Sequence, residues 1–351
     1  MLIYYLVFIL SFLFCVLDFT DKVYLKVSIY TLFCLFLIAL VGFKAIGLDN
    51  DSINYVEMLK QADNYTFLEI FKGDYSENTE RGYMLLNKLI LVMGGDERVL
   101  FILVASATGI LNYTFFYKNS CFPFTSLLFY LSFFLLYRDF TQIRYGLSCA
   151  LVFWSLHNLA QFKYFRALLL FAASLLFHNS AFILIPVLAL CFFIKNKYFY
   201  PVLVVLSLIG IFYNFFSVVL TLGGVPEHMQ IYLEEESGGG LAVAALGFLI
   251  MAIYFINASV FNDTKDLSYS LYYRVFALGL ALSLIFYQTS IFQRFSYLLF
   301  QFGILLLPNM LYVLQTGEKR YYYFMLHIVF LLFFLYYGIK LIDPALIRPY
   351  F

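Results

Sequence analysis

Residues that could do chemistry gather in five short clusters of this sequence, each beside the end of an apolar run. The clusters combine arginines, carboxylates, a histidine and tyrosines, and they occupy residues 47–55, 80–83, 138–146, 177–180 and 288–297. Polar and charged groups at such positions in an apolar chain are costly, so they indicate a functional site. Arginine suits the binding of an anion, and histidine or a carboxylate suits the transfer of a proton.

The cluster at 138–146 contains two arginines with a glutamine between them. A helix that begins near Asp139 places Arg138 and Gln142 on the face that also carries Tyr145. Arg144 then lies more than one turn inside the boundary of the membrane. Since the planar guanidinium group matches a phosphate or a carboxylate, this cluster predicts an anion site.

An ion pair is the alternative role for these arginines, with Asp139 or Glu80 as the partner. Arg294 lies at the same expected level on a distant apolar segment, three residues before Tyr297. Three arginines exceed what one aspartate can neutralise, which favours the anion site.

His178 occupies a polar His-Asn-Ser step at the outer end of an expected helix. Histidine titrates near neutral pH and can accept the proton of a hydroxyl group, so His178 is the first candidate for a general base. Its alternative role is packing, and Glu80 and Asp49 are the next candidates for the base. Asp49 and Asp51 match no complete metal-binding motif, and we predict neither a metal site nor a cofactor.

Aromatic and acidic residues alternate in the stretch 44–98. Carboxylates accept hydrogen bonds from hydroxyl groups, and aromatic faces stack on sugar rings. The stretch therefore suits a carbohydrate, with Tyr55 and Tyr83 as candidate contacts.

The composition shows that a lipid bilayer must hold these clusters. Of the 351 residues, 64% are apolar and 12% are charged, against about 25% charged in average proteins. A soluble enzyme and a disordered protein are excluded. The net charge of +1 offers no basic surface for a nucleic acid.

The apolar runs predict an all-α polytopic membrane protein with about twelve transmembrane helices, in which residues 1–351 form a single domain. The expected spans are residues 2–17, 27–43, 99–116, 121–137, 140–156, 166–178, 180–194, 199–218, 241–261, 274–292, 295–314 and 321–340. A further apolar piece, 82–93, is too short to cross and is expected to be an interfacial or re-entrant helix.

Charge sets the expected orientation. One set of connections carries eleven basic and five acidic residues, and the opposite set carries the other eleven basic and sixteen acidic residues. The more basic set is cytoplasmic by the positive-inside rule. Both termini and the loops 44–98 and 219–240 then face outward, on the side of all five polar clusters.

The clusters together resemble the EpsG family, which contains Wzy-type polymerases of O-antigen and exopolysaccharide. The shared pattern is G-x-D with a tyrosine six residues after the aspartate, E-x-G-Y, R-x3-Q-x-R-x-G, and F-H-x-S-A ahead of a proline. The matching positions are Gly47, Asp49, Tyr55, Glu80, Gly82, Tyr83, Arg138, Gln142, Arg144, Gly146, Phe177, His178, Ser180 and Ala181, with Arg294 and Tyr297 in a looser match.

The resemblance implies a glycosyltransferase without a nucleotide sugar. Its donor and acceptor would be oligosaccharide repeat units on undecaprenyl pyrophosphate, at the outer face of a bacterial inner membrane with the active site toward the periplasm. The growing glycan would move to the non-reducing end of the incoming unit. A chain-length-regulating co-polymerase is a further expected partner.

The resemblance also implies a role for each of the matching site residues. The base would come from His178, Glu80 or Asp49, and the other positions would bind pyrophosphate and sugar. Those binding positions are Arg138, Arg144, Arg294, Gln142, Tyr55, Tyr83 and Tyr297.

Two other functions share part of this pattern. An O-antigen ligase-like glycosyltransferase uses the same chemistry with a different acceptor. A flippase for lipid-linked oligosaccharides would place charge through the centre of the membrane and show two related halves. This chain shows neither feature.

Overall fold

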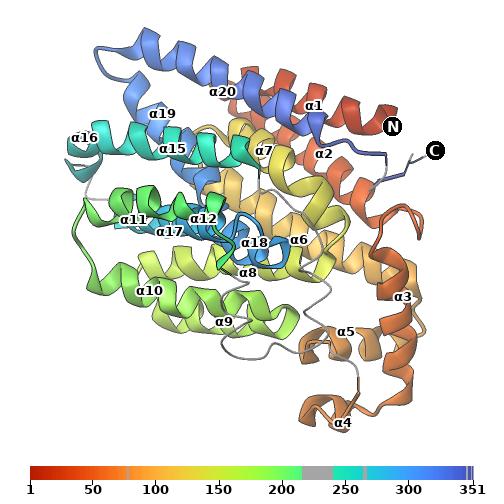
Figure 1. The fold of residues 1–351 in the computed structure, drawn as a ribbon. Helices are drawn as coiled ribbons and strands as arrows, with labels where there is room; N and C mark the ends of the chain where they lie inside the picture. Colours follow the sequence, from red (N-terminus) through yellow and green to blue (C-terminus); the bar gives the residue numbers. More distant parts are fainter. Residues whose placement is uncertain (77–78, 216–239, 264–266, 345–346, 349, 351) are drawn as a thin grey trace. The chain divides into compact units, whose positions relative to one another are not determined.

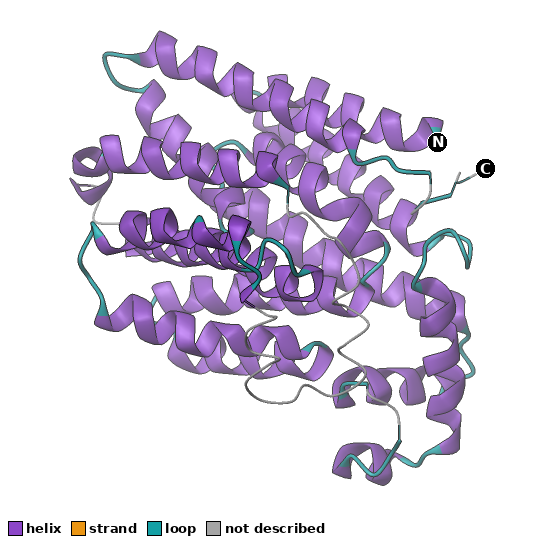
Figure 2. Ribbon diagram, in the orientation of Figure 1, coloured by secondary structure: helices purple, strands orange, loops and turns teal. Residues whose placement is uncertain are grey.

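The computed structural model describes residues 1–350 except residues 77–78, 216–239, 264–266, 345–346 and 349. Within these residues every regular element is a helix, and the one β-type pairing is an isolated bridge between Asp49 and Ile347 (Figure 2). A helix satisfies its backbone hydrogen bonds within one segment, as a hydrocarbon environment requires. The predicted all-α fold is confirmed. The expected outer loop 219–240 lies outside the described residues, apart from Gly240.

Two compact units divide the chain: residues 1–179 with 311–351 form unit 1, and residues 180–310 form unit 2. The helices of unit 1 are α1 Leu2–Phe14, η1 Cys15–Phe19, α2 Val23–Gly42, α3 Ser52–Gln61, η2 Ala62–Asn64, α4 Phe67–Lys72, α5 Arg81–Val92, α6 Glu97–Asn119, α7 Pro123–Tyr130, η3 Leu131–Phe140, α8 Ile143–Ala160, α9 Tyr164–Phe177 and α20 Arg320–Lys340. The helices that lie wholly or partly in unit 2 are η4 Asn179–Ile183, α10 Leu184–Phe193, α11 Phe199–Ser207, α12 Ile209–Phe212, α15 Leu241–Ile256, α16 Ala258–Asp263, α17 Leu267–Ile285, α18 Ser290–Phe300 and α19 Gly303–Gln315.

Five helical segments are long and apolar enough to cross a membrane, so the chain is a helical membrane protein. They are Leu2–Phe19, Val23–Gly42, Glu97–Asn119, Phe292–Gln315 and Arg320–Lys340. Each expected span overlaps at least one helix, but the number of twelve crossings is not confirmed. Several expected spans are broken; for example, 199–218 contains the separate helices α11 and α12.

Both ends of unit 1's chain meet at the loop that follows α2. The hydroxyl group of Tyr4 donates a hydrogen bond to the carbonyl oxygen of Arg348 (3.3 Å). The backbone N–H of Arg348 donates to Leu48 (2.9 Å), beside the bridge from Asp49 to Ile347. Residues 4 and 348 therefore lie close together in unit 1, beside the loop after α2.

Glycines bring α2 and α6 into close contact. A Cβ atom at Gly109 would lie 2.4 Å from Cγ1 of Ile38, and one at Gly42 would lie 3.2 Å from Cα of Ile102. These pairs show that the two helices run antiparallel. In Figure 1, α3 crosses the end of this pair instead of following it.

The stretch 44–98 contains short helices. The expected piece 82–93 is present as α5, whose twelve residues extend over only about 18 Å, less than the hydrocarbon thickness of about 30 Å. Helix α4 begins at a capping box, in which Thr66 and Glu69 exchange hydrogen bonds between their side chains and backbone.

The helix predicted to begin near Asp139 is wrong in its boundary. Arg138 and Asp139 lie at the end of the π-helix η3, and α8 begins only at Ile143 after a break at Thr141 and Gln142. The hydroxyl group of Thr141 donates to the carbonyl oxygen of Tyr137 (2.7 Å), which closes η3. Arg138 and Gln142 therefore do not share a face of one continuous helix.

Candidate functional site

Glu80 and Arg144 form an ion pair in unit 1. Nη1 of Arg144 contacts Oε2 of Glu80, and the side chains are 17% and 10% exposed for Arg144 and Glu80 respectively. The guanidinium group lies over the rings of Tyr55 (5.8 Å) and Tyr83 (5.4 Å). The two rings meet edge to face at 5.9 Å and are both buried. Arg144 is thus held in one orientation by two aromatic rings and one carboxylate.

Arg144 keeps unused hydrogen-bonding capacity. Its Nε is buried and has no hydrogen-bond partner among the described residues. A guanidinium group has five N–H donors in a planar fork, and the contact with Glu80 engages one edge of that fork. Nε itself is covered by the surrounding side chains, so an anion would reach the guanidinium group at the part of the side chain that stays exposed.

Gly82 explains how α5 reaches this position. A Cβ atom at Gly82 would lie 2.5 Å from Cβ and 2.7 Å from the carbonyl oxygen of Leu176 on α9. The missing side chain lets the start of α5 contact the end of α9. There, Oε1 of Glu80 accepts a hydrogen bond from the backbone N–H of Asn179 (3.3 Å). One carboxylate therefore connects Arg144 to the residue that follows His178.

We expect Gly82→Ala to lower the stability of the protein by about 1–3 kcal/mol, because the added methyl group overlaps a backbone oxygen that cannot move freely. The thermal unfolding temperature of the purified protein in detergent measures this effect. Gly317→Ala is the matched control, since its Cβ atom would meet nothing closer than 3.6 Å. Equal unfolding temperatures for the two variants would contradict the close contact between α5 and α9.

His178 lies at the C-terminal end of α9 in an extended conformation and is half-buried. Its ring meets the ring of Tyr145 edge to face at 5.1 Å. Because Tyr145 follows Arg144 directly and Glu80 contacts Asn179, His178 and Arg144 belong to the same small region of unit 1.

Arg138 lies in a different, fully buried environment. Its guanidinium group is 4.1 Å from the centre of the Phe134 ring and 5.1 Å from that of Tyr130. Nε of Arg138 is 3.6 Å from Oδ1 of Asp139. The other carboxylate oxygen of Asp139 accepts a hydrogen bond from Tyr130, which in turn accepts one from Asn112 of α6.

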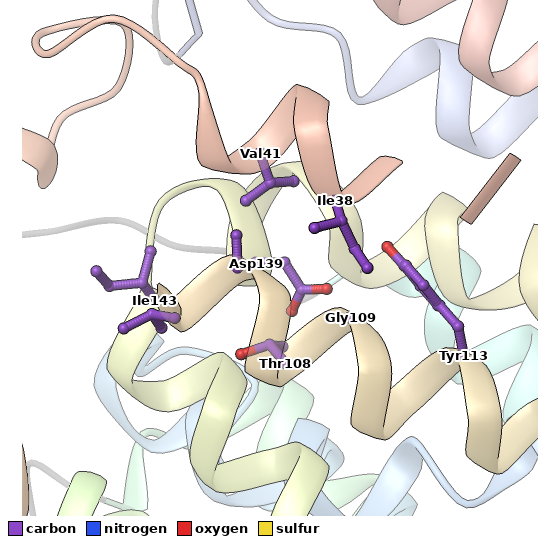
Figure 3. A pocket seen from close by; sticks show the side chains of 9 residues that line it. Ile38, Val41, Thr108, Gly109, Tyr113, Asp139 and Ile143 are labelled. Carbon is purple, nitrogen blue, oxygen red and sulfur yellow. The ribbon is translucent and has the colours of Figure 1, made fainter. Parts of the chain in front are cut away.

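Gly146 makes room for this carboxylate. A Cβ atom there would lie 3.0 Å from Oδ1 of Asp139. Asp139 also lines a small cavity of about 10 Å³ together with Thr108 of α6 (Figure 3). The cavity has room for one water molecule.

Both ion pairs that the sequence offers as the alternative role are present, Arg138 with Asp139 and Arg144 with Glu80. They differ in exposure: the Arg138 side chain is 2% exposed, whereas Arg144 is at the rim of the buried region. Of the two arginines, Arg144 is the better placed for a ligand.

Asp49 has a structural environment. Its carboxylate forms a fully buried ion pair with Lys44 (2.7 Å) and accepts backbone hydrogen bonds from Asp51 (3.0 Å) and Ser52 (2.8 Å). Lys44 also donates to the carbonyl oxygen of Phe140 at the end of η3. Burial lowers the pKa of Lys44, and the Asp49 carboxylate acts in the opposite direction. This pair fixes the loop after α2 against the break between η3 and α8.

The remaining predicted residues are more dispersed. Gln142 is half-buried at the N-terminal end of α8. Arg294 and Tyr297 lie on α18 of unit 2, so their convergence with the residues of unit 1 stays a prediction. Among the residues that the structure describes, no three His, Cys, Asp or Glu side chains are grouped to hold a metal ion.

Sequence reasoning missed Lys44, Tyr130 and Asn112. Lys44 stands directly between an apolar run and the G-x-D step, which could have indicated a partner for Asp49. Tyr130 and Asn112 lie inside apolar runs, and polar groups at that depth need partners.

These features define a helical membrane protein with a preorganised arginine, carboxylates and a histidine gathered at one end of its larger unit. The chain belongs to the EpsG family: the family model matches residues 27–351, nearly the whole chain. This membership indicates a polysaccharide polymerase-like membrane protein. No curated protein and no solved structure matches the chain.

Proposed function

We propose that the protein is a glycosyltransferase that polymerises lipid-linked oligosaccharides at the outer face of a bacterial inner membrane. The donor is a growing glycan on undecaprenyl pyrophosphate, and the acceptor is the non-reducing end of a lipid-linked repeat unit. The observation that carries the proposal is the Arg144 guanidinium group, which lies on two tyrosine rings, is paired with Glu80 and keeps 17% of its side chain exposed.

The reaction balances without a cofactor. The acceptor hydroxyl oxygen forms a bond to the anomeric carbon of the donor, and the bond from that carbon to the pyrophosphate oxygen breaks. The electron pair leaves with the pyrophosphate, and Arg144 stabilises the developing negative charge. His178 accepts the proton of the hydroxyl group.

Glu80 acts as a positioning residue in this scheme. One of its carboxylate oxygens contacts Arg144 and the other accepts the N–H of Asn179, so it fixes both the arginine and the backbone beside His178. Asp49 holds Lys44 and the loop after α2. Tyr55 and Tyr83 support Arg144, and their neighbourhood is where a sugar ring would stack.

The glycan profile of cells that lack the gene tests the function. A polymerase predicts that the ladder of long glycans disappears while one repeat unit remains attached to its final acceptor. Loss of that single unit as well would point to a ligase or a flippase and contradict the proposal.

The orientation can be checked with a cysteine that the protein already has. Cys121, between α6 and α7, is the exposed one among the five cysteines, and it lies on the expected cytoplasmic side. An impermeant maleimide should therefore leave wild-type protein unlabelled in intact spheroplasts and label it after permeabilisation.

Ser76→Cys, in the expected outer loop, should be labelled in intact spheroplasts under the same conditions; Ser76 is also exposed. Labelling of Cys121 before permeabilisation would reverse the assigned orientation.

A further inference from the structure

A groove of about 210 Å³ lies between α2 and α6 of unit 1, and none of the candidate site residues lines it. Its walls include Thr31 and Leu35 of α2 and Ile110 and Thr114 of α6. Leu35 and Ile110 are each 56% exposed, and both helices are long and apolar enough to cross a membrane. The groove therefore opens toward lipid.

The groove has one closed end. At Gly109 the two helices approach so closely that a Cβ atom would overlap Ile38, and both residues line the groove. Beyond this contact lies the cavity beside Asp139, which has room only for one water molecule. A hydrocarbon chain that enters the groove therefore ends near Gly109.

The length of the groove matches one leaflet of a bilayer. Its lining on α6 extends from Gly109 to Lys118, nine residue steps or about 13.5 Å of helix. Half of the hydrocarbon core of a bilayer is about 15 Å thick. Since a dry cavity of about 150 Å³ binds benzene, the volume also accommodates a hydrocarbon segment of more than six carbons.

The opposite end of the groove is basic. Lys118 lines it from the last turn of α6, and Lys26 lies one helical turn before the groove residue Tyr30 on α2. The rings of Tyr30 and Tyr117, which also line the groove, meet at 4.9 Å. Basic residues at the end of a crevice between transmembrane helices are suited to a lipid phosphate.

We propose that the α2–α6 groove binds one acyl chain of an anionic phospholipid, whose phosphate group lies at Lys118. The length of the bound acyl chain is set by the closed end at Gly109, and the preference for an anionic headgroup is set by Lys118. By the expected orientation, this lipid belongs to the cytoplasmic leaflet. It would support the packing of α2 against α6 behind the site at the other end of the same helices.

Native mass spectrometry of the full chain in detergent tests the proposal. The purified protein is titrated with phosphatidylglycerol and, separately, with phosphatidylcholine of the same acyl chains. We expect one saturable phosphatidylglycerol adduct that binds about fivefold more tightly than phosphatidylcholine, which corresponds to ~1 kcal/mol for one lysine near the headgroup.

Two pairs of variants test the binding of the acyl chain and the preference for the headgroup separately. Thr114→Trp fills the groove and should remove the adduct, whereas Leu103→Trp, at an exposed position of the same helix outside the groove, should keep it. Lys118→Gln should remove the preference for phosphatidylglycerol, whereas Lys163→Gln, on the same expected side, should not.

An adduct that survives in Thr114→Trp as in Leu103→Trp would overturn the site. Equal binding of both phospholipids to the wild type would overturn the anionic headgroup. Displacement of phosphatidylglycerol by undecaprenyl phosphate, lost in Thr114→Trp, would identify the tail of the substrate as the occupant and overturn the phospholipid. None of these results depends on polymerase activity.

Discussion

Replacing Arg144 by lysine is expected to remove the long glycans nearly as completely as replacing it by alanine. A lysine keeps the charge but loses the planar fork that lies on Tyr55 and Tyr83 and that can hold two phosphate oxygens. Loss of one such contact to a developing charge raises the activation free energy by about 2.7–4 kcal/mol, which lowers the rate by about 10²–10³-fold. The measurement is the length distribution of the glycan at matched protein abundance. Arg98→Lys, at an exposed arginine in the first turn of α6, is the control.

A double variant distinguishes an anion site from a structural ion pair. Arg144→Ala alone leaves Glu80 nearly buried without its partner, which is destabilising by itself. Arg144→Gln combined with Glu80→Gln removes both charges and relieves that penalty. We expect the double variant to regain abundance and remain without long glycans. Recovery of the ladder together with abundance would show that the pair only stabilises the fold.

Replacing His178 by glutamine is expected to leave the protein folded and yet reduce transfer by about 10²–10⁴-fold, the usual contribution of a general base. Glutamine preserves hydrogen bonding and much of the contact with Tyr145, but it cannot accept the proton. Because a long glycan requires many successive transfers, such a reduction leaves single repeat units. Binding of the lipid-linked donor to purified protein should be unchanged.

His157→Gln provides the matched control for that variant. His157 also packs against aromatic rings, those of Phe115 and Trp154, but it lies near the opposite end of α8. A full ladder in His178→Gln cells would assign His178 to packing and remove the proton acceptor from the proposed reaction.

The helical class and the grouping of the motifs could be predicted from sequence because both depend on local properties. Long apolar runs have few alternatives to helices in a bilayer. The motif residues Glu80, Arg144 and His178 fall at the ends of such runs, and the structure places them in one region of unit 1.

The sequence predicts a break between the spans 121–137 and 140–156, but the structure places it two to three residues later, at Thr141 and Gln142. What creates the break is tertiary: Lys44 donates to the carbonyl oxygen of Phe140, a residue 96 positions away. The spacing of apolar residues along a helix gives no sign of that contact. The sequence therefore predicts Arg138 on the face of the following helix, whereas it lies in η3. The burial of Arg138 against Phe134 follows from the same break.

The roles of Asp49 and Gly82 illustrate a second limit. A conspicuous carboxylate suggests proton transfer, but Asp49 is paired with a lysine only five residues earlier, and its role depends on how fully that pair is buried. Gly82 has no functional group, and its importance appears only when the end of α9 is placed against α5.

The contact of residues 347–348 with Leu48 and Asp49 has a consequence for how the protein forms in the cell. Domains and their parts fold during synthesis in the order in which the ribosome releases them. The loop after α2 is among the first segments to be released, but its backbone partners are made about three hundred residues later. Until then the Lys44–Asp49 loop lacks part of its final support. The loop that carries Lys44 and Asp49 therefore receives its last backbone contacts late in biosynthesis.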